Sequence, residues 1–216
     1  IRDWSWSRGL GDVYKRQTVI GANRLIPVLT IKDARHAVPL AKALVRGGLT
    51  ALEVTFRTDA AREAIRRIAG EVPDAIVGAG TVTVPRQLAE AEADGAVFAV
   101  SPGCTPRLLA AARASALAWL PAAATAGEAM TLADEGYTHQ KFFPAEASGG
   151  VAALQQLAPL PAIGFCPTGG LSPSNAAEYL ACPNVFAIGG SWPAPAKLIE
   201  GAVSYTHLTL PTSRSV

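Results

Sequence analysis

Two charged side chains of the kind that do chemistry lie inside apolar segments of this 216-residue chain. Glu53 stands within the run ALEVT, and Lys141 stands within HQKFF, directly before two phenylalanines. A lone lysine in a strand is more often a surface charge. A lysine and a glutamate that are both buried, however, are each costly unless they are paired or functional. We therefore expect the two side chains to share one largely apolar pocket.

Such a pocket has a chemical use. An amine in apolar surroundings loses its proton more readily and becomes a nucleophile toward a carbonyl carbon. The iminium that results draws electrons from the adjacent carbon, and a nearby carboxylate can then move protons. Arg57, just past the Glu53 run, suits a substrate carboxylate because its planar guanidinium matches two oxygens. Thr81, at the end of the run that closes with GAG, is a third polar residue at a strand end.

Short apolar runs alternate with alanine-rich amphipathic segments along the body of the chain. The runs recur roughly every 20–25 residues, the length of a strand, two loops and a short helix. The eight runs are Leu25–Ile31, Ala51–Thr55, Ala75–Gly80, Val97–Ser101, Leu117–Ala122, His139–Phe143, Ala162–Pro167 and Val185–Gly190. The segments between them are predicted to be helices, for example Asp33 to Gly47, which a glycine pair ends.

This alternation predicts an α/β fold with a parallel sheet covered by helices. Eight strand–helix units favour a closed (β/α)8 barrel, the TIM barrel, over the alternative of an open doubly wound sheet. Only SWPAPAKLIEG follows the last run before an irregular tail, so we expect the closing C-terminal helix to be truncated. Because side chains alternate along a strand, Glu53 and Lys141 can both face the barrel interior.

Glycine pairs follow the seventh and eighth runs, in CPTGGLSPSN and IGGSW. A single pair is ordinarily a tight turn. Two pairs in these two loops favour a phosphate site, because glycine lets backbone N–H groups approach an anion and barrel enzymes often bind phosphate there. Ser172 and Ser174 precede a helix start expected near Asn175, whose N-terminal dipole also favours an anion.

Several classes of protein do not fit the sequence. The sequence contains no uninterrupted apolar run of about 18 residues, so we expect no membrane-spanning helix. Nothing in it resembles a signal peptide. Without the two tails the formal charge falls from +2 to −1, which gives no basic face for nucleic acid. Three unpaired cysteines indicate a cytoplasmic, reduced protein. GAGTV lacks the full dinucleotide fingerprint, and the three histidines lack ligand spacing, so we expect no cofactor and no metal.

The motifs LEVTFRT, VGAGTV, SPG, KFFPAE, CPTGG and IGGSW occur in this order over about residues 18–200. In this they resemble the family of 2-keto-3-deoxy-6-phosphogluconate (KDPG) aldolase and 4-hydroxy-2-oxoglutarate aldolase. The resemblance implies a trimeric (β/α)8 lyase of the Entner–Doudoroff pathway that forms a Schiff base without a cofactor or metal. The implied reaction cleaves KDPG to pyruvate and glyceraldehyde 3-phosphate.

The resemblance also implies roles for residues of this chain. Lys141 would form the Schiff base, and Glu53 would shuttle protons. The expected substrate-binding residues are Arg57 and Thr81 for the pyruvyl carboxylate, Pro102 and Phe143 for the pocket wall, and Thr168, Gly169, Gly170, Gly190 and Ser191 for the phosphate. One departure is Pro121-Ala122, where the family often has Pro-Gly. An alanine there costs about 1 kcal/mol if the position needs a positive φ.

Other readings stay open at this point. The preferred substrate can be the unphosphorylated 4-hydroxy-2-oxoglutarate or the galactonate epimer of KDPG. The chain can also be an inactive phosphate-binding barrel, or an isomerase or synthase on another phosphorylated metabolite, although these would not need a lysine inside the sixth strand. Fold alone does not separate these classes.

The two ends of the chain look foreign to the rest. Residues 1–17 and 203–216 show no helical or strand period and resemble translated adapter sequence. We therefore expect the native domain to span residues 18–202, with non-native tails on both sides.

Overall fold

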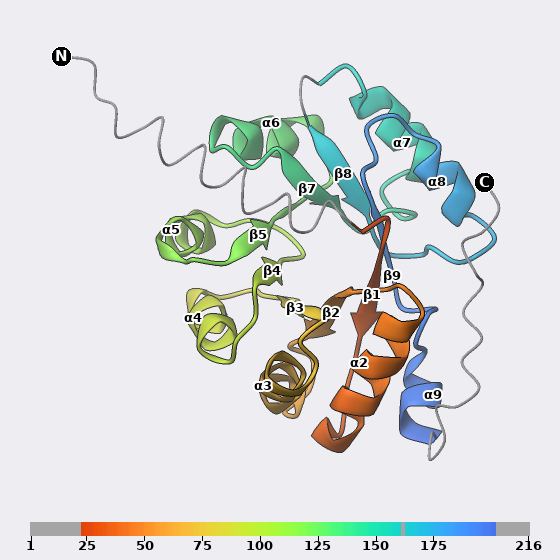
Figure 1. Cartoon of the computed structure of the whole chain (residues 1–216). Helices are drawn as coiled ribbons and strands as arrows, with labels where there is room; N and C mark the ends of the chain where they lie inside the picture. Colours follow the sequence, from red (N-terminus) through yellow and green to blue (C-terminus); the bar gives the residue numbers. More distant parts are fainter. Residues whose placement is uncertain (1–22, 161–162, 202–216) are drawn as a thin grey trace.

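The computed structural model describes residues 23–160 and 163–201, so both predicted tails and the ends of the predicted domain fall outside the described residues. Within this part, strands and helices alternate along the chain (Figure 1). The strands are β1 (Leu25–Leu29), β2 (Ala51–Thr55), β3 (Ile76–Gly80), β4 (Phe98–Val100), β5 (Ala118–Leu120), β6 (Ala122–Ala123), β7 (His139–Phe142), β8 (Gly164–Pro167) and β9 (Ile188–Gly190).

The helices follow the strands in turn, and Figure 1 shows them around the outside of the strands. They are η1 (Ala34–His36, a 3-10 turn), α2 (Ala37–Arg46), α3 (Ala61–Glu71), α4 (Pro85–Ala93), α5 (Pro106–Ala114), α6 (Ala126–Asp134), α7 (Gly150–Leu157), α8 (Ala176–Leu180) and α9 (Ala196–Gly201). None of the described helices is long and apolar enough to cross a membrane. The predicted helix from Asp33 to Gly47 is confirmed, with η1 as its first turn.

All strand pairs are parallel, and they form two sheets. One has the order β5-β4-β3-β2-β1-β9 and the other the order β6-β7-β8. The predicted strand Leu117–Ala122 is divided because Pro121 has no N–H to donate, although its carbonyl accepts from the Lys141 N–H at 2.8 Å. Isolated parallel bridges, Phe165 with Val185 and Thr168 with Gly189, connect β8 to the chain around β9. The α/β fold with parallel strands is therefore confirmed.

The buried apolar side chains form two clusters, because successive residues of a strand point to opposite faces. In β5, for example, Trp119 belongs to the large cluster between strands and helices, whereas Ala118 and Leu120 belong to the small one. The small cluster consists of Ile26, Phe98, Val100, Ala118, Leu120, Cys166 and Ala187. It thus joins side chains from both sheets on the face that the helices do not cover.

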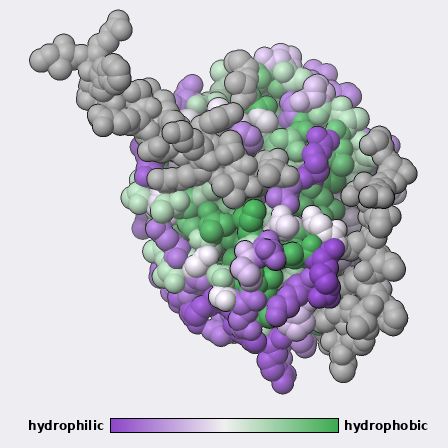
Figure 2. Space-filling view, viewed as in Figure 1, coloured by the Kyte–Doolittle hydropathy of each residue, from purple (hydrophilic) through white to green (hydrophobic). Residues whose placement is uncertain are grey.

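The outer helices carry their charges on the solvent side. In α3, Ala64, Ile65 and Ile68 are buried against the strands, while arginine and glutamate side chains face out. Figure 2 shows hydrophilic surface along the lower rim of the view, where α2 and α3 lie in Figure 1. This is the amphipathic pattern expected of helices that cover a sheet.

A buried carboxylate ties α3 to the end of α4. Asp94 is 3% exposed and accepts from Arg62 Nε at 2.6 Å and from Arg66 Nη2 at 2.8 Å. Burial alone would raise the pKa of Asp94, but the two arginine hydrogen bonds outweigh it and lower that pKa below its usual value. Asp94 therefore stabilises the fold in its charged form.

We predict that Asp94→Ala lowers the free energy of unfolding by about 1–2 kcal/mol at neutral pH, a modest value because both arginines are half-exposed and screened. Since the folded pKa is lowered, the deficit is present above about pH 4 and shrinks as the pH falls through the folded pKa. Urea unfolding at several pH values measures it. The control Glu63→Ala removes an exposed ion pair with Arg66 and should change little. A deficit that persists at low pH contradicts this account.

Candidate active site

Lys141 and Glu53 meet, although they lie on strands of different sheets. Lys141 Nζ is 3.3 Å from Glu53 Oε1 and 3.5 Å from Oε2. Their side chains are 7% and 4% exposed. The structure therefore brings together the two residues that the sequence analysis expects to meet, and both side chains are buried. A buried ion pair contributes little net stability, because removing two charges from water is costly. A chemical role therefore explains this pair better than a structural one.

The position of the Glu53 side chain depends on the absence of a side chain at Gly80. Glu53 lies in the middle of β2, with Val28 of β1 and Gly78 of β3 as its neighbours in register. A Cβ atom placed at Gly80 would lie 2.3 Å from Glu53 Oε1, closer than any side chain tolerates. Glycine at position 80 thus leaves the space that the carboxylate occupies.

Besides Glu53, an aromatic ring and a thiol lie near Lys141. Its Nζ lies 5.4 Å from the centroid of the Phe143 ring, a distance at which an ammonium group is attracted to the ring face. Cys166 of β8 stands in register beside Lys141. Burial raises the pKa of the Cys166 thiol to about 12, so the thiol stays neutral next to the amine. Sequence reasoning missed Cys166, and only the register of β7 with β8 reveals it.

Arg57 and Thr81 come together at the ends of β2 and β3. Arg57 Nε donates to Thr81 Oγ1 at 3.2 Å, and Arg57 is otherwise exposed. Among the described residues, no carboxylate is recorded as an ion-pair partner of Arg57. Thr81 has a φ of 58°, in the left-handed region that β-branched residues rarely adopt. Such backbone strain is typical of functional sites, and here it accompanies a guanidinium available to an anion.

The glycine-rich loop after β8 lies next to the end of β9. Thr168 is buried, and Gly169 and Gly170 follow it with φ values of 98° and 85°. The bridge between Thr168 and Gly189 brings the chain at Gly190 alongside. The two predicted phosphate loops are therefore adjacent.

The remaining predicted residues lie just after strands or at the start of α8. Pro102 and Ser191 follow β4 and β9, and both are exposed. Asn175 is the N-cap of α8, close to the predicted helix start, whereas the hydroxyls of Ser172 and Ser174 bond to each other at 2.7 Å.

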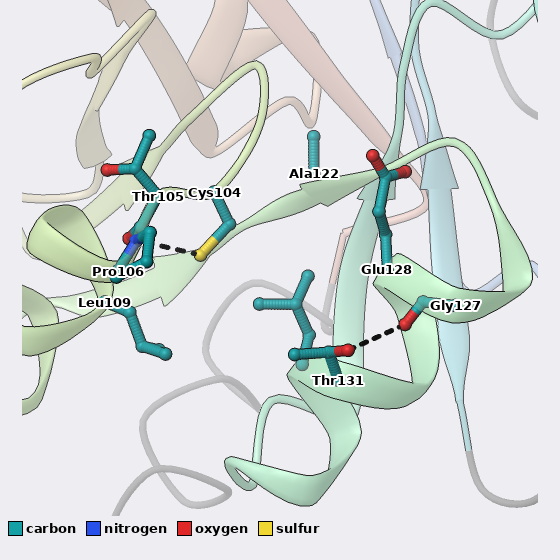
Figure 3. A pocket seen from close by; sticks show the side chains of 9 residues that line it. Cys104, Thr105, Pro106, Leu109, Ala122, Gly127, Glu128 and Thr131 are labelled. Carbon is teal, nitrogen blue, oxygen red and sulfur yellow. Dashed lines mark hydrogen bonds between the residues drawn. The ribbon is translucent and has the colours of Figure 1, made fainter.

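A separate hollow of about 380 Å³ lies between the first turns of α5 and α6 (Figure 3). Leu109 and Thr131 face it from the two helices, and Thr131 Oγ1 donates back to the carbonyl of Gly127 at 2.8 Å. Neither Lys141 nor Glu53 lines this hollow. In the described part of the chain, no three or more His, Cys, Asp and Glu side chains are grouped as a metal site.

The fold and the site together define a parallel α/β protein with a lysine–glutamate pair buried between its strands. The sequence model of the family described as KDPG and KHG aldolase matches residues 17–206. The chain therefore belongs to the KDPG and KHG aldolase family.

Individual relatives agree with this assignment. The chain is 57% identical to the 2-dehydro-3-deoxy-phosphogluconate aldolase of Pseudoalteromonas atlantica, over 85% of this chain and 86% of that one. It is 51% identical to the KHG/KDPG aldolase of Escherichia coli K12, over 89% and 91%. Among solved structures, the KDPG aldolase of Legionella pneumophila, with pyruvate captured as a covalent carbinolamine, has a TM-score of 0.83 and 44% identity over 86% and 90%.

The space at Gly80 gives a direct prediction. Gly80→Ala should lower the free energy of unfolding by about 1–3 kcal/mol, because its methyl group overlaps the Glu53 carboxylate in a packed interior. It should also lower aldolase activity, because the carboxylate must move away from Lys141. Urea unfolding and a pyruvate-release assay measure the two effects. Gly70→Ala is the matched control: Gly70 lies in α3 with nothing within 4 Å of an added Cβ, so this change should preserve activity and raise the free energy of unfolding slightly, because alanine favours a helix over glycine. Equal free energies of unfolding and equal activities of the two variants would contradict the prediction.

Proposed function

We propose that the protein is a class I aldolase that cleaves KDPG to pyruvate and glyceraldehyde 3-phosphate. The observation that carries the proposal is the buried contact between Lys141 Nζ and Glu53 Oε1. Such a pair provides an amine nucleophile and a proton carrier side by side in the buried interior. The names of the relatives support the substrate, since those from P. atlantica and E. coli are both named as aldolases of this class of sugar acid.

The reaction would run through a Schiff base on Lys141. The amine adds to the C2 ketone of the substrate to give a carbinolamine, which loses its C2 hydroxyl as water and becomes the iminium. Glu53, through a water molecule, removes the proton of the C4 hydroxyl, and the C3–C4 bond breaks to release glyceraldehyde 3-phosphate. The bonding electrons pass to C3 and form an enamine. Protonation of C3 and hydrolysis of the iminium then release pyruvate and restore the amine.

The two ends of the substrate would bind at opposite sides of the pair. Arg57 and Thr81 suit the pyruvyl carboxylate, because Arg57 is tied to Thr81 at 3.2 Å and presents a planar donor fork. Phe143 and Pro102 would form the wall between the two ends. Thr168, Gly169, Gly170, Gly190 and Ser191 would surround the phosphate through backbone N–H groups and hydroxyls.

We also infer that the strands close into a (β/α)8 barrel. β5 and β6 would be one strand position interrupted at Pro121. At the other side, the bridge between Thr168, directly after β8, and Gly189 of β9 links the two sheets. The small apolar cluster, with side chains from both sheets, would then be the barrel interior. The truncated closing helix, the homotrimer, the cytoplasmic location and the non-native tails stay predictions.

A second substrate is favoured by one specific observation. The relative from E. coli is named KHG/KDPG aldolase, which includes 4-hydroxy-2-oxoglutarate. That molecule has the same pyruvyl end and would use Lys141, Glu53, Arg57 and Thr81 in the same roles. It ends in a carboxylate at C5 in place of the longer phosphorylated end, so it would depend less on the glycine loops.

The decisive variant is Lys141→Met, which keeps the length of the side chain but removes the amine. We predict that KDPG cleavage, followed as pyruvate release, falls by roughly 10³-fold or more because no covalent intermediate can form. The matched control is Lys42→Met on the exposed side of α2, which should retain full activity. An inactive wild-type protein, or a Lys141→Met variant with wild-type activity, would overturn the proposal.

Metal independence gives a separate prediction. Dialysis of the wild-type protein against EDTA should leave the rate of KDPG cleavage unchanged, because the protonated imine of Lys141 already serves as the electron sink. Addition of Mg²⁺ or Zn²⁺ to the dialysed protein should not raise the rate. A loss of activity that added metal restores contradicts a Schiff-base mechanism without metal.

A further inference from the structure

Glu146 lies directly against the loop that we assign to the phosphate. A Cβ atom placed at Gly170 would lie 2.4 Å from Glu146 Cγ and 2.6 Å from its Cβ. The backbone N–H of Glu146 donates to the carbonyl of Gly169 at 3.1 Å. The Glu146 side chain therefore occupies the space that glycine leaves at position 170.

The carboxylate of Glu146 is held by partners on the segment that follows the loop. The hydroxyl of Tyr179 donates to Glu146 Oε1, and Asn175 Nδ2 donates to the same oxygen at 3.4 Å. Tyr179 is fully buried. Burial and the bond to Glu146 raise the pKa of Tyr179, so its hydroxyl remains a protonated donor across the working pH range.

Asn175 extends these contacts to the loop itself. Its Nδ2 also lies 3.3 Å from the carbonyl of Gly170, and its Oδ1 accepts from the N–H of Ser172 at 2.8 Å. Gly169 and Gly170 both have positive φ. Because glycine adopts many backbone conformations, the loop needs contacts from neighbouring residues to hold it in this one. The hydrogen bonds that join Tyr179, Glu146 and Asn175 to each other and to Gly170 supply those contacts.

The same segment is attached to the strand that carries Lys141. Thr168 donates through its N–H to the carbonyl of Phe142 at 3.0 Å, and the N–H of Ala145 donates to the carbonyl of Thr168 at 2.8 Å. Glu146 thus stands five residues after Lys141, in the turn that links the end of β7 to the glycine loop. A shift of Glu146 would move the loop relative to the amine.

A role in stability alone does not account for a glutamate here. Glu146 is exposed, and its negative charge next to a phosphate site opposes the binding of an anion. Its Oε1, however, accepts hydrogen bonds from Tyr179 and Asn175. The side chain therefore holds the loop by packing against Gly170 and by these hydrogen bonds. We propose that Glu146, fixed by Tyr179 and Asn175, is a positioning residue that sets the glycine loop for a phosphorylated substrate. This inference rests on the proposed function of the same site.

The test compares two substrates that differ in the phosphate. Steady-state cleavage of KDPG and of 4-hydroxy-2-oxoglutarate is measured for wild type, Glu146→Ala, Glu146→Gln and Tyr179→Phe. We expect Glu146→Ala and Tyr179→Phe to raise KM for KDPG about tenfold with little change in kcat, as the loss of one hydrogen bond to a charged group implies. Cleavage of 4-hydroxy-2-oxoglutarate should stay unchanged.

Glu146→Gln should recover most of the wild-type KM, because the amide oxygen still accepts from Tyr179. Glu178→Ala is the matched control, an exposed glutamate of α8 that should behave as wild type. Equal losses for both substrates, or no rise in KM for KDPG in Tyr179→Phe, would overturn the inference. Failure of the proposed function is distinct, because the wild-type protein itself would then cleave neither substrate.

Discussion

The buried pair of Lys141 and Glu53 is the constraint on which the other features of the site depend. Loss of one partner would leave an uncompensated charge in the interior, which typically costs about 3–5 kcal/mol. The fold therefore has to hold β2 and β7 at a fixed separation even though they belong to different sheets. Gly80 makes room for the carboxylate, and the neutral Cys166 thiol adds no second charge beside the amine.

In the function proposed above, the strand ends around this pair form two binding regions of different chemistry. The strained Thr81 and the exposed Arg57 offer a donor fork on one side. On the other side, the glycine loop after β8 offers backbone N–H groups. A molecule with a carboxylate beside a ketone and a phosphate at its far end fits both regions at once. On the same proposal, an unphosphorylated keto acid would use the Lys141 chemistry while it relies mainly on the side of Arg57 and Thr81.

Much of this arrangement follows from the sequence, and the exceptions have physical causes. Strand β2 matches its predicted bounds, Ala51–Thr55, because an apolar run around a single charge is a clear signal. Pro121 divides one predicted strand, since it lacks an N–H. The run Val185–Gly190 yields a regular strand only from Ile188. Glu146 closes the motif KFFPAE, but its role could not be predicted, because its partner Tyr179 is 33 residues away and their contact depends on packing.

The most direct test of the account is covalent trapping of pyruvate. The protein is incubated with pyruvate and sodium borohydride, and intact mass and peptide mapping then locate any reduced adduct. The account predicts one pyruvyl adduct, on Lys141, in a protein that circular dichroism shows to be folded. A folded protein with no adduct, or with label only on surface lysines such as Lys42, would contradict Schiff-base chemistry at this site.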